Sequence, residues 1–436
     1  MAIDKQPSCD DVIEPELLPV EIALQRIAQQ VQPLSADETS NSEQLGLRES
    51  LDRVVAKDIL SPINVPAYTN SAMDGYAVNG ADIPEPEDST EKQLSVLGTA
   101  WAGRPLDVMV NPGQAVRIMT GGMMPPGTDT VVIQEHVQAT ETNGEVSSIT
   151  IDNTTSVGRN VRLAGEDIKT SDVIITAGTL MTPAHVGLIA SLGIDQVTVY
   201  RRLKVAFFST GDELRALETH AGKTLGPGEL FDSNRHTLFA MLVRLGVELV
   251  DLGVVADTAE ATREALKQGA ECADLIISSG GVSAGQADFV SATLAELGEV
   301  TFWKLAMRPG RPLACGKIGG AHFFGLPGNP VAVMVTFYEF VQPALKYMMG
   351  RKEIHTPLFP VKSGGHIRKS HGRIEYQRGI ITQTADGSLE VNTTGKQGAG
   401  RLTSMSSANC LIVLPVECAG VEAGDIVQVQ PFTGLI

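Results

Sequence analysis

Hydrophobic and polar positions follow two alternating patterns between residues 203 and 350. Short apolar runs such as "LKVAFFST" and "ADLIISS" are typical of buried strands, while "TAEATREALKQGAEC" has its apolar residues at helical spacing. The same alternation continues through "HTLFAMLVRLG", "VELVDLGVV", "ADFVSATLAELG", "VTFWKLAM" and "NPVAVMVTFYEFVQPALKYM". Strands that alternate with helices predict a doubly wound α/β domain around a central parallel sheet.

The flanking segments follow other patterns, so we predict a multidomain chain. Residues 17–55 and 160–202 mix helical and extended stretches and are expected to form an elongated N-terminal domain. Short β-type runs split by Gly and Pro in residues 56–159 predict a small β domain, and those in residues 355–436 predict a barrel-like C-terminal β domain. Residues 1–16 are expected to be a flexible acidic tail.

Composition narrows the range of functions. The 436 residues carry a formal charge of −17, which argues against non-specific nucleic-acid binding because that needs a basic surface. Five cysteines without a C-x-x-C pair argue against a disulfide framework. The acidic start lacks the apolar core of a secretory signal, and the apolar segment 331–349 contains Glu339 and Lys346. We therefore expect a cytoplasmic protein with no membrane partner.

Candidate chemistry lies at the predicted carboxyl ends of the strands, where open α/β sheets bind ligands. Three Gly-rich, polar turns enter helices there, in "STGDEL", "SSGGVSAGQAD" and "GLPGNP". Such turns present backbone N–H groups and helix N-termini to anions. Structural roles stay open as alternatives: Asn329 and Pro330 suit the start of a helix, and Asp257 with Glu260 suits a capping box.

Four acidic residues follow predicted strands near these turns: Asp212, Glu213, Asp257 and Asp288. Two like charges about 4 Å apart repel by roughly 4 kcal/mol at a dielectric constant of about 20, so several acids would disfavour an anion in the adjoining loop. A Mg²⁺ ion resolves this conflict, because proteins hold it with one or two carboxylates together with substrate phosphates. The alternative is a solvated rim, for these acids and for the nearby bases Lys304, Arg308 and Arg311.

Residues 281–285 match G-x-S-x-G, the nucleophile elbow of α/β-hydrolases, in which Ser283 would be the nucleophile. A hydrolase also needs an acid and a histidine later in the chain, and His322, His366 and His371 are the candidates. The predicted sheet leaves little fold in which to place these partners. We favour the interpretation in which the glycines form a loop that binds phosphate.

Seven motifs, in order along almost the whole chain after the acidic tail, resemble the molybdopterin molybdenumtransferase family, the bacterial relatives of the gephyrin E domain. They are "NSAMDGYAV", "RIMTGGMMPPGTDTVV", "GEDI", "STGDEL", "DSNRHTL", "SSGGVSAGQAD" and "GLPGNPVA". Each motif alone is weak, but the ordered set is highly specific.

The resemblance implies an enzyme that completes the molybdenum cofactor. Family members take adenylylated molybdopterin and molybdate, release AMP with Mg²⁺ present, and leave the metal on the pterin dithiolene. They resemble elongated four-domain homodimers, in which the active cleft joins the α/β domain of one subunit to the small β domain of the other. Other proteins of cofactor biosynthesis are further expected partners.

The resemblance also assigns residues, motif by motif. It implies six catalytic residues: Asp74, Thr120, Asp167, Glu213, Asp257 and Asp288. Two of these, Glu213 and Asp288, are the expected Mg²⁺ ligands. The implied substrate-binding residues are Gly280, Gly281, Ser283, Gly285, Lys304, Arg308, Pro327, Gly328, Asn329, Pro330, Arg378 and Ser404.

Several positions depart from the family pattern. Arg308 and Arg311 stand where lysines are common, Ala332 and Ala399 stand where serines are frequent, Gln286 replaces a frequent acid, and Gly122 replaces the usual Ala. Arginine keeps the charge of lysine but changes the hydrogen-bond geometry. The alternatives are therefore a homologue that prefers tungstate and a non-catalytic scaffold that binds the pterin.

Overall fold

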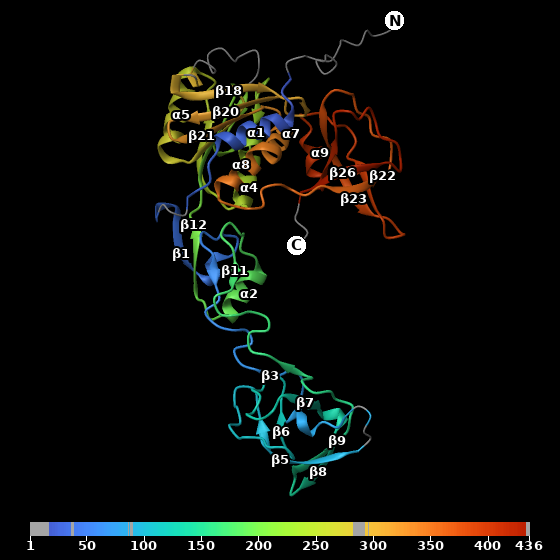
Figure 1. The fold of residues 1–436 in the computed structure, drawn as a ribbon. Helices are drawn as coiled ribbons and strands as arrows, with labels where there is room; N and C mark the ends of the chain where they lie inside the picture. The colour runs from blue at the N-terminus through green and yellow to red at the C-terminus, as the bar shows by residue number, and fades with distance from the viewer. Residues whose placement is uncertain are drawn as a thin grey trace.

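The computed structural model describes residues 17–35, 39–85, 87, 90–281, 293–294 and 296–432 of the chain. The molecule is elongated (Figure 1). An α/β domain and a C-terminal barrel lie side by side at one end, a small β domain lies at the other end, and a narrow middle domain connects them. This confirms the predicted multidomain architecture.

The α/β domain is built on a six-stranded sheet with the order β16-β13-β17-β21-β20-β18. Its strands are β13 (Lys204–Thr210), β16 (Glu248–Val255), β17 (Leu275–Ser279), β18 (Gly298–Lys304), β20 (Pro312–Ile318) and β21 (Ala321–Leu326). The first four in the sheet order are parallel, as predicted. Strands β20 and β18 add an antiparallel edge, because β20 turns directly into β21 through Gly319 and Gly320.

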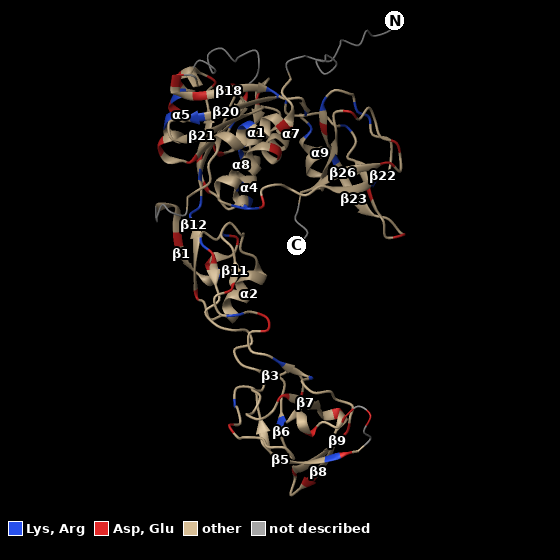
Figure 2. Ribbon diagram, in the orientation of Figure 1, with Lys and Arg blue, Asp and Glu red and all other residues tan. Residues whose placement is uncertain are grey.

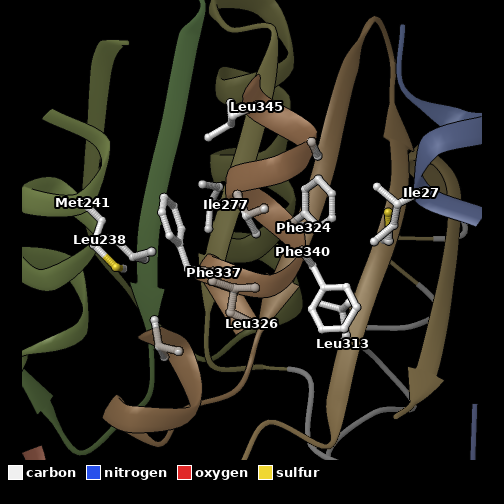
Figure 3. Close-up of a cluster of buried hydrophobic side chains, with 14 of the residues drawn as sticks. Ile27, Leu238, Met241, Ile277, Leu313, Phe324, Leu326, Phe337, Phe340 and Leu345 are labelled. Atoms are coloured by element: carbon white, nitrogen blue, oxygen red, sulfur yellow. The ribbon is translucent and has the colours of Figure 1, made fainter. Parts of the chain in front are cut away.

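Helices cover both faces of this sheet. They are α1 (Val20–Gln30), α4 (Asn234–Leu245), α5 (Ala259–Cys272), α7 (Pro330–Thr336), the π-helical turn η5 (Phe337–Val341) and α8 (Gln342–Met348). Along β13, Val205 and Phe207 join the core under α1, α4 and α7, while Ala206 and Phe208 join the core under α5. Figure 3 shows part of the first core, including Phe324, Phe337 and Phe340.

Helix α1 packs on the α/β domain, although its residues lie within the range predicted for the N-terminal domain. Its buried residues Val20, Ala23 and Ile27 recur every three or four positions and form one apolar face. The chain before α1 is fixed beside β18, since the Leu18 N–H donates to the Lys304 carbonyl at 2.8 Å. The amphipathic pattern thus predicted the helix but not the sheet that it covers.

The C-terminal domain is a closed five-stranded barrel in which β23 pairs with both β24 and β25. Its strands are β22 (Phe359–Ser363), β23 (Ile374–Gln383), β24 (Leu389–Thr393), β25 (Cys410–Leu414) and β26 (Ile426–Pro431), and its helix is α9 (Leu402–Ser406). A short strand of the α/β domain, β19 (Met307–Arg308), pairs with β23. The two domains are therefore joined by backbone hydrogen bonds, which places Arg308 against the barrel.

The middle and small β domains complete the chain. The middle domain contains β1 (Ser42–Gly46) paired with β12 (Gln196–Tyr200), β2 (Ile59–Leu60) paired with β11 (Val173–Ile175), and helix α2 (Pro183–Ser191). The small domain has the sheet β7-β4-β6-β5-β9-β8, whose strands are β4 (Gly75–Val78), β5 (Lys92–Ala100), β6 (Gln114–Ile118), β7 (Thr130–Ile133), β8 (Gln138–Thr142) and β9 (Glu145–Ile151). Strands β3 (Asn70–Ser71) and β10 (Val161–Arg162) pair where the two connections between these domains run.

Short elements fill the turns. They are η1 (Thr39–Asn41), η2 (Leu47–Ser50), η3 (Gly80–Asp82), η4 (Gln134–His136), β14 (Leu214–Arg215), β15 (Leu230–Phe231) and α3 (Leu217–His220). Among the described helices, none is long and apolar enough to cross a membrane.

Candidate functional site

Three loops meet at the carboxyl ends of the parallel strands β13, β17 and β21. The Gly280 N–H donates to the Leu326 carbonyl at 3.1 Å, which ties the loop after β17 to the end of β21. A Cβ atom at Gly280 would lie 2.3 Å from the Thr210 carbonyl oxygen at the end of β13. Gly280 also has a φ of +94°, so close approach and backbone conformation both require glycine. We call this place the sheet edge.

Asn234 fastens the loops of the sheet edge to one another. Its side-chain amide donates to the Ser279 hydroxyl at 2.9 Å and to the Gly328 carbonyl at 2.7 Å. Two residues earlier, just before α4, Asp232 accepts from the Ser209 hydroxyl at 3.2 Å. These positioning residues were not among the predicted site residues, although the motif "DSNRHTL" directly before α4 carried the signal.

Three carboxylates gather at the sheet edge: Asp212, Glu213 and Asp257. Burial raises the pKa of Asp257, and the negative charges of Asp212 and Glu213 raise it further. The Asp257 Oδ1 atom is buried and has no hydrogen-bond partner of good geometry in the described part of the molecule, and the nearby Thr210 side chain offsets only part of the rise in pKa. The capping-box alternative for Asp257 is wrong, because the N-cap of α5 is Thr258, whose hydroxyl accepts from the Ala261 N–H. Asp257 is therefore available for a ligand.

Part of the predicted site lies outside the described residues. This applies to Ser283, Gly285 and Asp288. Gly280 and Gly281 are described and lie at the sheet edge, where Gly281 has a φ of +71°. Across the residues that the structure describes, no three metal-ligating side chains cluster closely enough to hold a metal ion by themselves.

The positions of the histidines oppose the hydrolase alternative. His322 pairs with Leu275, at the amino ends of β21 and β17, whereas the G-x-S-x-G sequence follows the carboxyl end of β17. His322 is buried there, and burial lowers its pKa to about 4. His366 lies in the barrel next to Glu422, with 3.1 Å between its Nδ1 and the carboxylate. Neither histidine lies at the sheet edge, and the third candidate, His371, lies in an exposed turn just before β23 of the barrel.

The turn "GLPGNP" starts helix α7 at the sheet edge. Pro330 is the first helical residue, as the structural alternative predicted. Asn329 occupies the N-cap, but its side chain makes no capping hydrogen bond. Pro327 is buried, while Gly328 and Asn329 are exposed. Helix capping by the side chain therefore does not explain why this position is an asparagine.

A second group of predicted residues lines a pocket of about 620 Å³ between the α/β domain and the barrel. Arg378 is buried on β23, where its Nε donates to the Ser404 hydroxyl at 3.2 Å and its Nη2 to the Gly398 carbonyl at 3.3 Å. Burial and the charge of Arg308 lower the pKa of Arg378 to about 10. Two guanidinium groups thus share one pocket and repel each other.

Further cations line this pocket, which we call the basic pocket. They are Arg368, Lys369 and Lys396, with His366 beside them. Figure 2 shows several Lys and Arg positions where the barrel faces the α/β domain. The acid at the pocket is Glu375, 3.9 Å from Arg308. The predicted Lys304 ends β18, four residues before Arg308. Sequence reasoning missed Arg368 and Lys396, because nothing in a sequence marks which barrel loops face the neighbouring domain.

The remaining predicted residues lie far from both places within one chain. The Asp74 carboxylate accepts from the Thr120 N–H at 2.7 Å and from its hydroxyl at 2.8 Å, and the N–H bond in particular lowers the pKa of Asp74. Both residues belong to the small β domain, at the opposite end of the molecule from β17 and β21 (Figure 1). Asp167 lies in the segment from β10 to β11, which connects the small β domain to the middle domain, and its N–H donates to the Val65 carbonyl at 3.1 Å.

Three family models match this chain in order. The MoeA N-terminal region, domains I and II, matches residues 18–193; the probable molybdopterin binding domain matches residues 206–347; and the MoeA C-terminal region, domain IV, matches residues 360–432. Together they span nearly all of the described chain.

Whole proteins give the same result. A molybdopterin molybdenumtransferase of Haemophilus influenzae is 42% identical over 91% of this chain and 95% of its own length, and one of Nostoc is 35% identical over 90% of each. The crystal structure of a molybdopterin biosynthesis moeA protein from Pyrococcus horikoshii has a TM-score of 0.80 at 25% identity, covering 96% of this chain and all of that one. The chain therefore belongs to the molybdopterin molybdenumtransferase family, whose members are transferases of molybdenum cofactor biosynthesis.

Proposed function

We propose that this protein inserts molybdate into adenylylated molybdopterin and releases AMP in a Mg²⁺-dependent reaction. The observation that supports this most strongly is the basic pocket, in which Arg378 is held by Ser404 and faces the charge of Arg308. Two guanidinium groups held near each other are stabilised by a divalent oxyanion such as molybdate, which removes their repulsion and offers acceptors to planar donor forks.

The sheet edge is the proposed site of the nucleotide phosphates. Loops with the glycines Gly280 and Gly281 bring backbone N–H groups close to a ligand. Asn234 holds the loops after β17 and β21 in a fixed relation, so that binding does not have to order them. The exposed Asn329 side chain at the start of α7 is a further donor for an anion.

The carboxylates of the sheet edge fit a Mg²⁺ ion, which this site needs in order to accept phosphates. Asp257 has a buried oxygen without a hydrogen-bond partner of good geometry among the described residues, and a raised pKa. A divalent cation would coordinate this oxygen and favour the charged form of the carboxyl group. We propose Glu213 and Asp257 as ligands from the described residues, with Asp288 as predicted from the sequence. When bound, Mg²⁺ neutralises charge on the phosphates and makes AMP a better leaving group.

Asp74, Thr120 and Asp167 can take part in the same active site only if a second subunit supplies them. In one chain the small β domain lies at the opposite end from the sheet edge (Figure 1). We therefore propose a homodimer in which the Asp74–Thr120 pair of one subunit faces the sheet edge of the other. The lowered pKa of Asp74 keeps its carboxylate charged and oriented for that role.

The proposal is tested by incubating the protein with adenylylated molybdopterin, Mg²⁺ and either molybdate or tungstate, and measuring AMP. We expect AMP release that needs both Mg²⁺ and oxyanion, with molybdate effective at the lower concentration. AMP release no faster than in a protein-free control would contradict catalysis and favour a pterin-binding scaffold. A lower half-saturating concentration for tungstate would assign the chain to the tungstate-preferring alternative.

A further inference from the structure

A second pocket, of about 350 Å³, lies where the segment after α8 crosses between the α/β domain and the barrel. It is lined by Tyr338, Gln342 and Lys346 from the helix, by residues 351, 353 and 355–357 of the connecting segment, and by Phe359, Leu411, Gln430, Pro431 and Phe432 of the barrel. None of these residues lines the basic pocket. We call it the linker pocket.

Two cations face the linker pocket without an ion-pair partner among the described residues. Lys346 lies in the last turn of α8, and Arg351 is the third residue after the helix ends. Burial and the charge of Arg351 lower the pKa of Lys346 to about 8. Burial also lowers the pKa of Arg351, and its buried Nε atom has no hydrogen-bond partner in the described part of the chain. The two positive groups therefore repel each other at the linker pocket.

The other groups that face the pocket do not cancel this charge. Glu353 acts on Arg351 but is itself exposed, so water screens its effect. His355 adds no negative charge, and Arg244 of α4 adds a further positive charge near Tyr338. Gln342 and Gln430 contribute neutral amides, which donate to an anion as well as accept.

One wall of the linker pocket is aromatic. The rings of Tyr338 and Phe432 stack with centroids 5.8 Å apart and an interplanar angle of 22°. Leu411 and Phe359 extend this wall along the barrel. A pocket with an apolar wall and a few convergent charged groups is the usual design of a small-ligand site, and the volume is within the common range of about 300–1,000 Å³.

We propose that the linker pocket binds a small organic phosphate, with the phosphate on Lys346 and Arg351 and the body of the ligand against Tyr338 and Phe432. A dianion fits better than a carboxylate, because two half-buried positive charges are matched by two negative ones. Arg351 offers a donor fork and Lys346 a point charge, a pairing that suits phosphate oxygens. The ligand would connect the α/β domain with the barrel, which together form the basic pocket.

The test uses Lys346 as its own reporter in the full-length protein. Trace acetylation with acetic anhydride, quantified for each lysine by mass spectrometry over pH 6–10, gives the pKa of every amine. The probes are phenyl phosphate, inorganic phosphate and phenol. A bound dianion raises the pKa of Lys346, and each unit lowers its reactivity at pH 7 about tenfold. We expect this protection with phenyl phosphate, a weaker one with inorganic phosphate, and none with phenol.

Matched variants separate this pocket from the proposed catalytic site. Arg351→Gln should abolish the protection and raise the pKa of Lys346 in the free protein, because a like charge is removed. Phe432→Ala should abolish the preference for phenyl phosphate over inorganic phosphate. Arg378→Gln should leave the protection of Lys346 intact, and Lys362, exposed on β22, should show none in any protein.

The inference is overturned if phenyl phosphate leaves the reactivity of Lys346 unchanged, or if the protection persists in Arg351→Gln. Loss of the protection in Arg378→Gln would assign the effect to the basic pocket and would equally overturn it. Circular dichroism of each variant checks the fold. Because none of these readouts involves AMP, the outcome is independent of whether the proposed reaction occurs.

Discussion

At the scale of single residues, the same physical conflict appears twice: like charges are held close together. Asp257 with Asp212 and Glu213 forms the acidic case, and Arg378 with Arg308 the basic one. In both, burial and repulsion shift a pKa toward the neutral form of the group. Such shifts cluster at functional sites, and each is relieved by a ligand of opposite charge. Under the proposed function, the sheet edge therefore suits Mg²⁺ with the nucleotide phosphates, and the basic pocket suits the molybdate oxyanion.

Replacing Arg378 by lysine tests the basic end. Lysine keeps the charge but loses the fixed fork that Ser404 and Gly398 hold in place. We expect the half-saturating molybdate concentration for AMP release to rise about tenfold or more, which corresponds to the loss of one charge-assisted hydrogen bond. Arg263→Lys on α5, where the side chain pairs with Glu296, is the matched control and should behave as the unaltered protein. An unchanged molybdate dependence in Arg378→Lys would remove Arg378 from the site.

The raised pKa of Asp257 should make Mg²⁺ binding at the sheet edge depend on pH. Only the carboxylate form binds Mg²⁺, and Asp257 takes up its proton at a higher pH than an ordinary aspartate does. We therefore expect the Mg²⁺ concentration needed for AMP release to increase as the pH falls toward that pKa. Asp257→Asn should need more Mg²⁺ at every pH and lack this dependence, while Asp386→Asn in an exposed barrel turn should retain it. A pH dependence that is identical in Asp257→Asn and the unaltered protein would show that another group titrates.

At the scale of elements, the helix from α7 to α8 connects the α/β core to the barrel. It passes through the π-helical turn η5, which turns Glu339 toward Tyr376 on β23 and Gln430 on β26. Burial raises the pKa of Glu339 to about 7, and its Oε1 atom lacks a hydrogen-bond partner within the described residues. A group that is more easily protonated when folded stabilises the folded state below its unfolded pKa and loses this contribution as the pH rises through its folded pKa.

Glu339→Gln should therefore remove a pH dependence of stability. The unaltered protein should lose free energy of unfolding relative to the variant as the pH rises from about 4.5 to about 7, the pKa values of the unfolded and folded carboxyl. The total should be of the order of 3 kcal/mol, since each pKa unit corresponds to about 1.4 kcal/mol. Urea unfolding of both proteins between pH 4 and 8 gives this difference directly. A constant difference across that range would mean that Glu339 is not protonated in the folded protein.

The elements themselves were largely predictable, but their partners were not. The strand and helix patterns of residues 203–350 predicted β13, β16, β17, α4, α5 and α7 because apolar periodicity is a local property. The antiparallel edge of β20 and β18, the closure of β23 onto β25, and the packing of α1 on the sheet depend on contacts between distant segments. For the same reason, the resemblance could assign Arg378 and Ser404, but nothing in the sequence marked Arg368 or Lys396, which line the basic pocket beside Arg378.

At the scale of the whole molecule, the elongated shape separates the predicted catalytic residues. Glu213 and Asp257 lie in the domain at one end of the molecule, and Asp74 and Thr120 lie in the domain at the other end (Figure 1). A closed two-fold dimer with the subunits antiparallel would bring the two ends together twice, which gives two identical sites. The shape therefore has a function under this account: it lets each subunit reach the sheet edge of its partner.

Mixed dimers test this arrangement. Asp74→Ala and Glu213→Ala should each be inactive alone, but a heterodimer of the two has one intact site and one doubly altered site. Random association should restore about a quarter of the activity of the unaltered protein, because about half of the dimers are mixed and each has one of two sites intact. Differently tagged subunits, co-expressed and purified as a mixture, are suitable for the AMP assay. A mixture as inactive as either variant alone would place the whole site within one chain.

The proposed reaction couples release of AMP to transfer of molybdenum onto the pterin. The most direct measurement is a single-turnover reaction with adenylylated molybdopterin, molybdate and Mg²⁺, in which AMP and pterin-bound molybdenum are quantified in the same samples over time. We expect both products to rise at the same rate and in equal amounts, and omission of molybdate to suppress both. AMP that accumulates without molybdenum on the pterin, or molybdenum transfer that proceeds without AMP, would contradict it.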